Sequence, residues 1–170
     1  MSTNSTHTLQ RVHGRLDEAL SQELIEFWTA QNAVPDGEFD DRLPTVLSLL
    51  RNADGDIVGV SSARSTRLAL FANQPFHVFR YLLTREAAEA SDWLALLLAG
   101  CEILDERANA PDHSGEIGML VRITQLKLQQ AWPEAIWPQT GLVHAGFTEQ
   151  GHQLRVRYYQ DARIDMEARA

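Results

Sequence analysis

The sequence predicts a mixed α/β (α+β) fold, with a central sheet of about seven strands flanked by helices. Two observations support this prediction: β-prone apolar runs alternate with amphipathic helical stretches, and strong turn signals separate the runs. The chain has 170 residues, 44% apolar and 22% charged, which suffices for one ordinary hydrophobic core. We therefore expect a single domain over residues 1–170, with polar residues 1–7 forming a short flexible tail.

The first half of the chain predicts a strand, a helix and a hairpin. Residues 8–13 alternate weakly, which indicates a strand. Apolar side chains then recur at helical spacing from Leu16 to Trp28 and form one stripe. Asp54-Gly55 is typical of a hairpin turn, because these residues readily adopt left-handed backbone conformations. The strands on either side of this turn are expected at residues 45–50 and 57–63, the second with a possible extension to residue 71.

The second half predicts a central strand, a strand–helix–strand unit and a closing hairpin. Residues 76–84 are apolar on both faces, as in a strand that is covered on both sides. Ser91 or Asp92 is expected to cap the helix that follows. Later elements are expected as a strand at 117–124, a helix at 125–137 that is interrupted at Pro133, and hairpin strands at 142–148 and 153–159.

Composition argues against several classes of protein. The net charge of −8 and the scattered positive residues argue against a nucleic-acid partner. The longest apolar run, residues 93–99, is far shorter than the roughly 20 residues of a membrane-spanning helix. A single cysteine excludes an internal disulfide, and the N-terminus has no secretory pattern. We therefore expect a cytoplasmic protein that binds neither nucleic acid nor membrane.

The order of elements resembles the GNAT superfamily of acyl-CoA N-acyltransferases over nearly the whole chain, from Thr8 to Ile164. Residues 54–60 are similar to the family's second hairpin, and residues 81–98 run from strand to amphipathic helix where the family places its cofactor motif. Residues 146–159 are similar to its usual ending. The resemblance implies transfer of an acyl group from acetyl-CoA, or from another acyl-CoA, to a small-molecule or peptide amine, by a protein that can form a homodimer. The acidic surface would suit a cationic acceptor.

The resemblance also implies a position for the cofactor, in a gap between the strands at 76–84 and 117–124. Backbone groups of the first strand would pair with the pantetheine arm and polarise the thioester carbonyl. The diphosphate would lie at the start of the next helix, where N–H groups and the helix dipole favour anions. The cofactor-binding residues implied in this way are Tyr81, Leu82, Leu83, Arg85, Ser91, Asp92 and Trp93.

The expected phosphate turn departs from the family pattern. Arg85 matches the basic residue of that pattern, but residues 85–93 contain no glycine. Glu86, Glu89 and Asp92 add three carboxylates, each of which would cost on the order of a few kcal/mol near a phosphate. Either these side chains point away from the cofactor, or the ligand is not an ordinary coenzyme A. The alternative function is therefore a non-catalytic module that binds a ligand or a protein, for example as a homodimer.

Three residues are candidates for acid–base chemistry. Tyr81 is the candidate acid for the leaving thiolate, and His77 and Glu116 are candidate bases for the amine. Each also has a structural interpretation: a packing tyrosine, a hydrogen-bonded histidine and a solvated loop carboxylate. Cys101 lies on an apolar helical stripe and is expected to be an inert core residue. The histidines have no partners at metal-ligand spacing, so no metal site is expected.

Overall fold

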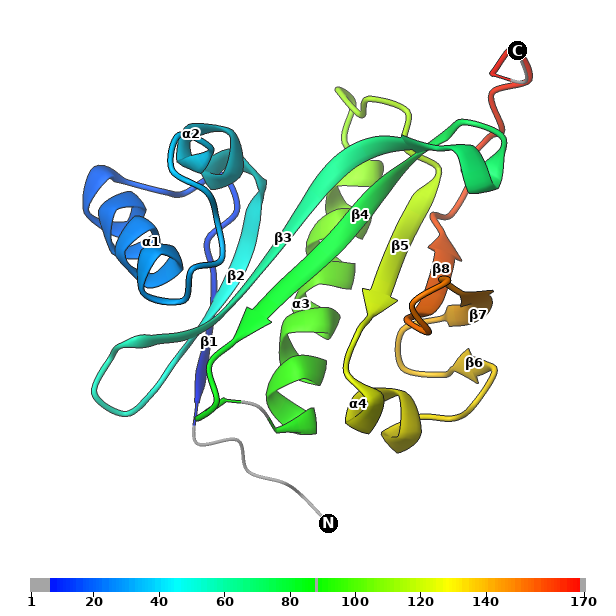
Figure 1. Ribbon diagram of the computed structural model, residues 1–170. Coiled ribbons are helices and arrows are strands. Elements are labelled where there is room, and N and C mark those ends of the chain that lie inside the picture. Colours follow the sequence, from blue (N-terminus) through cyan, green and yellow to red (C-terminus); the bar gives the residue numbers. More distant parts are fainter. Residues whose placement is uncertain (1–6, 88, 169–170) are drawn as a thin grey trace. The chain divides into compact units, whose positions relative to one another are not determined.

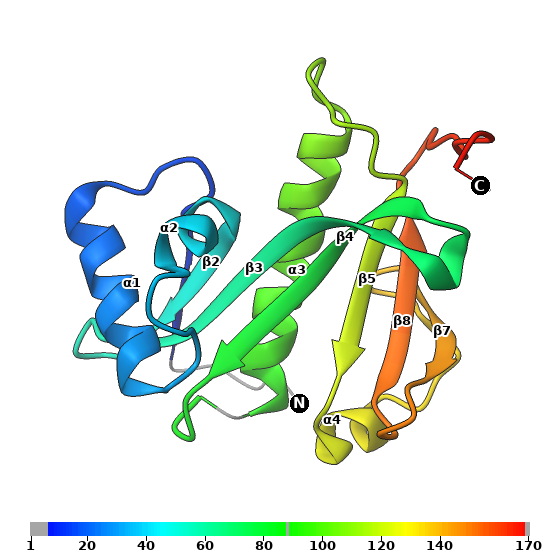
Figure 2. The same cartoon turned by 45° about the horizontal axis from the view of Figure 1, so that its top comes forward.

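A computed structural model describes residues 7–87 and 89–168 (Figures 1 and 2). Its helices are α1 (Glu18–Ala30), α2 (Phe39–Arg42), α3 (Ala90–Ala108) and α4 (Leu126–Ala131), with 3-10 turns at Leu43–Thr45 and Ala69–Phe71. Its strands are β1 (Thr8–Arg11), β2 (Val46–Arg51), β3 (Ile57–Leu68), β4 (Gln74–Leu83), β5 (Gly118–Ile123), β6 (Ile136–Trp137), β7 (Leu142–Phe147) and β8 (Gln153–Tyr158). The eight strands form one mixed sheet in the order β1-β2-β3-β4-β5-β8-β7-β6. The predicted fold class is therefore confirmed.

The chain divides into two compact units. Unit 1 takes residues up to 63 together with 81–100, and unit 2 takes 64–80 together with the residues from 101 onward. The strands β3 and β4 and the helix α3 therefore each contribute residues to both units. Among the described residues, no helix combines the length and the apolar character needed to cross a membrane.

The core of unit 1 lies between α1 and the strands β2 and β3 (Figure 1). The helix begins where Asp17 accepts a 2.8 Å hydrogen bond from the backbone N–H of Leu20, a typical N-cap. Its apolar stripe buries Leu24, Phe27 and Trp28 against both strands. The stripe that was predicted from periodicity is therefore the face on which the helix packs.

Two close approaches in the strands require glycine. A Cβ at Gly59 of β3 would lie 2.7 Å from Cδ2 of Leu83, inside the second core cluster of unit 1. A Cβ at Gly118 of β5 would overlap the backbone carbonyl of Arg157 and crowd the ring of Phe76. A side chain at either position would displace its neighbours, so these glycines serve packing rather than chain reversal.

In unit 2, β5 is the central strand. A parallel ladder joins His77, Val78 and Phe79 of β4 to residues 119–121 of β5. On its other edge β5 pairs antiparallel with β8 over its full length, from Gly118 to Ile123. β7 then pairs antiparallel with β8 (Figure 2). β4 and β5 are thus parallel neighbours, as the resemblance implies, and the gap expected between them stays a prediction.

Two local predictions were wrong. The segment 125–137 is not one interrupted helix, because α4 ends at Ala131 and Ile136–Trp137 form the edge strand β6, paired with Leu142 and Val143. This strand brings the total to eight. The helix α3 begins at Ala90, so Ser91 and Asp92 lie inside its first turn instead of capping it. Asp92 accepts its hydrogen bond from another part of the chain, as described below.

Candidate functional site

The predicted cofactor strand ends within unit 1. Tyr81 and Leu83 face a cluster formed by residues of β2, β3 and α3, whereas Leu82 faces the core beneath α1. After the strand, the backbone N–H of Thr84 donates a 2.9 Å hydrogen bond to the carbonyl of Val58. The backbone of residues 81–84 is therefore held in place by packing on both faces, which is a prerequisite for a site made of main-chain groups.

The turn between β4 and α3 packs into the core through one small residue, Ala87. Ala87 is fully buried, and its N–H lies 3.4 Å from Oγ1 of Thr84. Arg85, Glu86 and Glu89 are exposed on the same turn. The carboxylates of Glu86 and Glu89 are therefore in contact with water, where charge interactions are strongly screened. Ala88 lies outside the described residues.

The side chain of Asp92 is buried. It is 2% exposed, and its Oδ1 lies 3.0 Å from Nδ1 of His7, a residue that the sequence had placed in the N-terminal tail. A buried carboxylate is stabilised when a donor partners it. The side chain of Asp92 thus lies against His7, and the place of a cofactor at this turn stays a prediction.

Trp93 and Tyr81 form an aromatic pair beside this turn. Trp93 is fully buried, and its ring meets that of Tyr81 edge-on, with 5.7 Å between centroids and an interplanar angle of 76°. Such edge-to-face pairs stabilise a fixed ring orientation. Because Trp93 is buried, its effect on a ligand would be indirect, through the orientation it gives to the ring of Tyr81. Tyr81 and Ser91 are each half-buried, and Ser91 lies in the first turn of α3.

A polar cluster in unit 2 consists of the buried side chains of His77, Glu116 and Tyr159, with the exposed Ser114 at its edge. His77 and Glu116, both predicted as bases, lie together, with 3.9 Å between Nε2 and Oε1. Nδ1 of His77 lies 2.7 Å from the hydroxyl of Tyr159. All three side chains are at most 5% exposed. Tyr81, the predicted acid, lies instead in unit 1.

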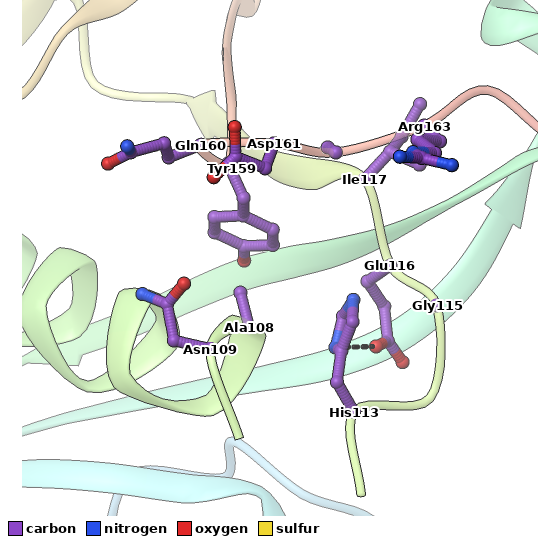
Figure 3. A pocket seen from close by; sticks show the side chains of 11 residues that line it. Ala108, Asn109, His113, Gly115, Glu116, Ile117, Tyr159, Gln160, Asp161 and Arg163 are labelled. Atoms are coloured by element: carbon purple, nitrogen blue, oxygen red, sulfur yellow. Dashed lines mark ion pairs between the residues drawn. The ribbon is translucent and has the colours of Figure 1, made fainter. Parts of the chain in front are cut away.

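The carboxylate of Glu116 is held in its charged form. Burial by itself raises the pKa of Glu116, but hydrogen bonds from Ser65, from its own backbone and from Ser114, with the charge of His77, hold that pKa below its ordinary value. Ser114 donates to both carboxylate oxygens, at 2.9 and 3.0 Å. Nδ1 of His113 lies 3.5 Å from Oε2 of the same carboxylate (Figure 3).

Tyr159 is the member of this cluster that the prediction of site residues omitted. Burial, followed by the nearby carboxylates Asp105 and Glu116, raises the pKa of its phenol far above the ordinary value, so the hydroxyl stays protonated. Alternation places Tyr159 on the face of β8 that carries the buried Arg155, opposite the exposed Tyr158, although Tyr159 lies one residue beyond the strand. Alternation indicates that the ring is buried but does not indicate its partner.

A pocket of about 440 Å³ opens beside the cluster (Figure 3). Three segments of unit 2 line it: the end of α3, the loop before β5 and the chain after β8. Glu116 and Tyr159 belong to its wall, whereas His77 lies behind them. A molecule that occupies this pocket would therefore lie beside the side chain of Glu116.

Other reactive side chains of unit 2 are accounted for by packing. Cys101 is buried with its Sγ 3.8 Å from Sδ of Met119, and burial raises the pKa of its thiol, which keeps it protonated and unreactive.

Over residues 7–87 and 89–168, no group of three or more His, Cys, Asp or Glu side chains is arranged to hold a metal ion.

Comparison with solved structures identifies the architecture. The chain is similar to an acetyltransferase of the GNAT family from Streptococcus pneumoniae, with a TM-score of 0.57, 11% identity, and coverage of 91% of this chain and 99% of that one. It is also similar to the ribosomal-protein-S5-alanine acetyltransferase from Vibrio fischeri, with a TM-score of 0.55, 12% identity, and coverage of 94% and 97%. This chain has a GNAT-like fold.

A third similar structure contains a ligand. It is a GNAT superfamily phosphinothricin acetyltransferase from Sinorhizobium meliloti in complex with AcCoA, with a TM-score of 0.55, 16% identity, and coverage of 93% of this chain and 91% of that one. At these identities the likeness concerns the GNAT-like fold. No protein-family model matches the chain, and neither does any curated protein sequence.

The expectation that nucleic acid is excluded as a partner was wrong. The net charge of −8 is a sum over the whole chain. Because binding depends on the local distribution of charge, such a sum does not exclude this class of partner.

Proposed function

We propose that this protein is an acyl-CoA-dependent N-acyltransferase, which moves an acetyl or longer acyl group from a coenzyme A thioester to an amine. The observation that supports it most is the state of the turn between β4 and α3. Asp92, in the first turn of α3, is buried against His7, so one of the three carboxylates of this segment is directed into the protein, while Glu86 and Glu89 stay exposed in water. Arg85 stays exposed on the same turn, where its guanidinium would pair with that group.

In the proposed reaction the amine nitrogen attacks the thioester carbonyl carbon, a C–N bond forms and the C–S bond breaks. Backbone groups around Tyr81, Leu82 and Leu83 would polarise the carbonyl, and the hydroxyl of Tyr81 would return a proton to the leaving thiolate. The edge-on contact with Trp93 would fix the Tyr81 ring for this role. The attacking amine must lose one proton, for which His77 and Glu116 are the proposed groups.

The base role requires that the acceptor enter the pocket beside Glu116. The carboxylate is ionised and lines that pocket, so it is the group able to take a proton there, while His77 would stabilise its charge from behind. A pH profile of acyl transfer separates the two roles. If Glu116 is the base, Glu116→Gln should lose the acidic limb of the pH profile of acyl transfer. If the profile of this variant is unchanged, Glu116 has no part in the mechanism.

Thermal unfolding with and without acetyl-CoA tests the function. A ligand that binds only the folded state stabilises it, by about 2.7 kcal/mol at about 100 times its Kd. We expect millimolar acetyl-CoA to raise the Tm of the wild type but not that of Arg85→Glu. Arg15→Glu, which changes another exposed arginine of unit 1, is the matched control and should respond like the wild type. No shift in the wild type would rule out the proposal.

Thiol release completes the test. With acetyl-CoA present, a panel of primary amines should produce free coenzyme A thiol at a rate that depends on the amine, and Tyr81→Phe should lower that rate. Acetyl-CoA binding without thiol release for any amine would instead support the alternative function, a ligand-binding module without catalysis. The pocket of unit 2 is the feature that favours this alternative.

A further inference from the structure

The pocket beside Glu116 has walls that are fixed in place. At the end of α3, the side-chain NH2 of Asn109 donates to the carbonyl of Asp105 at 2.9 Å, and the backbone N–H of His113 donates to the carbonyl of Ala110. The other side is formed by a C-terminal strap, residues 160–165 after β8, of which residues 160–163 line the pocket (Figure 3). The volume of the pocket, about 440 Å³, lies within the usual range of small-molecule sites.

The strap is held at both ends. At its start, Tyr159 bonds His77 through its hydroxyl and donates its N–H to the carbonyl of Ile117 at 3.0 Å. At its end, the buried side-chain amide of Gln74 holds the backbone of Asp165. The amide NH2 donates to the carbonyl of Asp165, and the amide oxygen accepts from its backbone N–H, each at 2.8 Å. The part between these anchors therefore keeps its position over the pocket without packing into the core.

The groups that face the pocket carry both signs of charge. The buried carboxylate of Glu116 forms part of the floor, and Arg163 and Asp161 on the strap are exposed. The NH2 of Asn109 is engaged, so the oxygen of its amide is the atom that can accept from a ligand. A buried charge is expensive in a protein and is a common mark of a binding site.

We propose that this pocket binds a small zwitterion with one ammonium and one carboxylate, that is, a free amino acid. The ammonium would lie toward Glu116 and the amide oxygen of Asn109, and the carboxylate would bind the guanidinium of Arg163. The apolar surface of Ala108 and Ile117 would contact the side chain. The proposal rests on the proposed function in one respect, because this is the pocket that the amine acceptor would enter there, but binding of the amino acid itself needs no coenzyme A and none of the residues proposed to bind coenzyme A.

Solution NMR of the full chain, without any cofactor, tests this. The twenty standard L-amino acids are added one at a time, with ethylamine and propionate as ligands that carry a single charge. We expect at least one amino acid to give saturable shifts of the amides at 108–117 and 159–163. Ethylamine and propionate should each bind at least about tenfold more weakly, because each lacks one charge-assisted hydrogen bond.

Two further variants change only exposed side chains, so a change in binding would not be caused by loss of the folded structure. Arg163→Ala should weaken binding of the amino acid about tenfold, whereas Arg122→Ala, which removes an exposed arginine of β5 outside the pocket, should leave it unchanged. The proposal is overturned if no amino acid saturates, if ethylamine binds as tightly as the best amino acid, or if Arg163→Ala binds like the wild type. Failure here leaves the acetyl-CoA result unaffected, since that titration changes only residues of unit 1.

Discussion

The hydroxyl of Tyr159 lies 2.7 Å from Nδ1 of His77, so one phenol links the end of β8 to the first half of β4. Both side chains are buried, and burial raises the pKa of Tyr159. The folded state therefore keeps the phenolic proton above pH 10.0, the ordinary pKa at which an unfolded tyrosine loses it. The stability that this shift contributes is complete below that pH and is lost as the pH rises further.

Tyr159→Phe should remove this alkaline loss. We expect the variant to be less stable at neutral pH by about 1 kcal/mol, because the hydrogen bond to His77 is gone, but to lose less stability between pH 9 and pH 11 than the wild type. Denaturant unfolding at several pH values measures both effects. Tyr158→Phe, which removes an exposed phenol, is the control. Parallel alkaline curves for wild type and Tyr159→Phe would contradict the assignment.

Glu116 should govern part of the acid response. Its pKa is lowered, so the stability it contributes is present above pH 4.5, its ordinary pKa, and is lost as the pH falls through the lower folded value. Glu116→Gln should be less stable than the wild type at pH 7, and the difference should shrink on acidification below that point. Glu149→Gln, in an exposed turn, should track the wild type throughout. A difference that stays constant with pH would show that folding does not lower the pKa of Glu116.

Arg155 should stabilise the segment between α4 and β6. It is fully buried, its guanidinium donates to the carbonyls of Trp132 and Glu134 at 3.2 and 2.7 Å, and it stacks 3.7 Å from the ring of Trp137. Arg155→Met fills similar volume but leaves these carbonyls without their donor. We expect a loss of about 3 kcal/mol with a change in tryptophan fluorescence. Arg122→Met changes an exposed arginine of the neighbouring strand and should be neutral within about 0.5 kcal/mol.

The two tightly packed glycines should respond differently to alanine. At Gly118 the new methyl would meet the backbone oxygen of Arg157, which can move only with β8. At Gly59 the closest atom is the end of the Leu83 side chain, which can rotate away. We expect Gly118→Ala to lose about 3 kcal/mol and Gly59→Ala about 1 kcal/mol. Chemical denaturation of the two variants measures the order, and a larger loss for Gly59→Ala would be inconsistent with this packing.

Local sequence signals were sufficient for most of the fold. The stripe from Leu16 to Trp28, the Asp54-Gly55 turn and the apolar run of β5 each specify their element through neighbours in sequence. The edge strand Ile136–Trp137 could not be predicted in that way. It depends on pairing with β7 and on the donors of Arg155, which approach from about twenty residues further along the chain.

The candidate site was predictable only in part. His77 and Glu116 were selected one by one, and their contact arises because the β4·β5 ladder brings two distant segments together. No periodicity indicates that Tyr159 completes their cluster, or that the side chain of His7 lies against Asp92, 85 positions away. Both pairings depend on tertiary contacts between residues far apart in sequence, which local patterns do not contain.

Hydrogen–deuterium exchange with and without acetyl-CoA tests the central proposal most directly, namely that the end of β4 and the turn after it bind an acyl-CoA. Bound cofactor should slow exchange at the amides of Tyr81, Leu82 and Leu83 and at the start of α3, and Arg85→Glu should abolish this protection. Unchanged exchange over residues 81–93 at saturating acetyl-CoA, or protection confined to other segments, would contradict it.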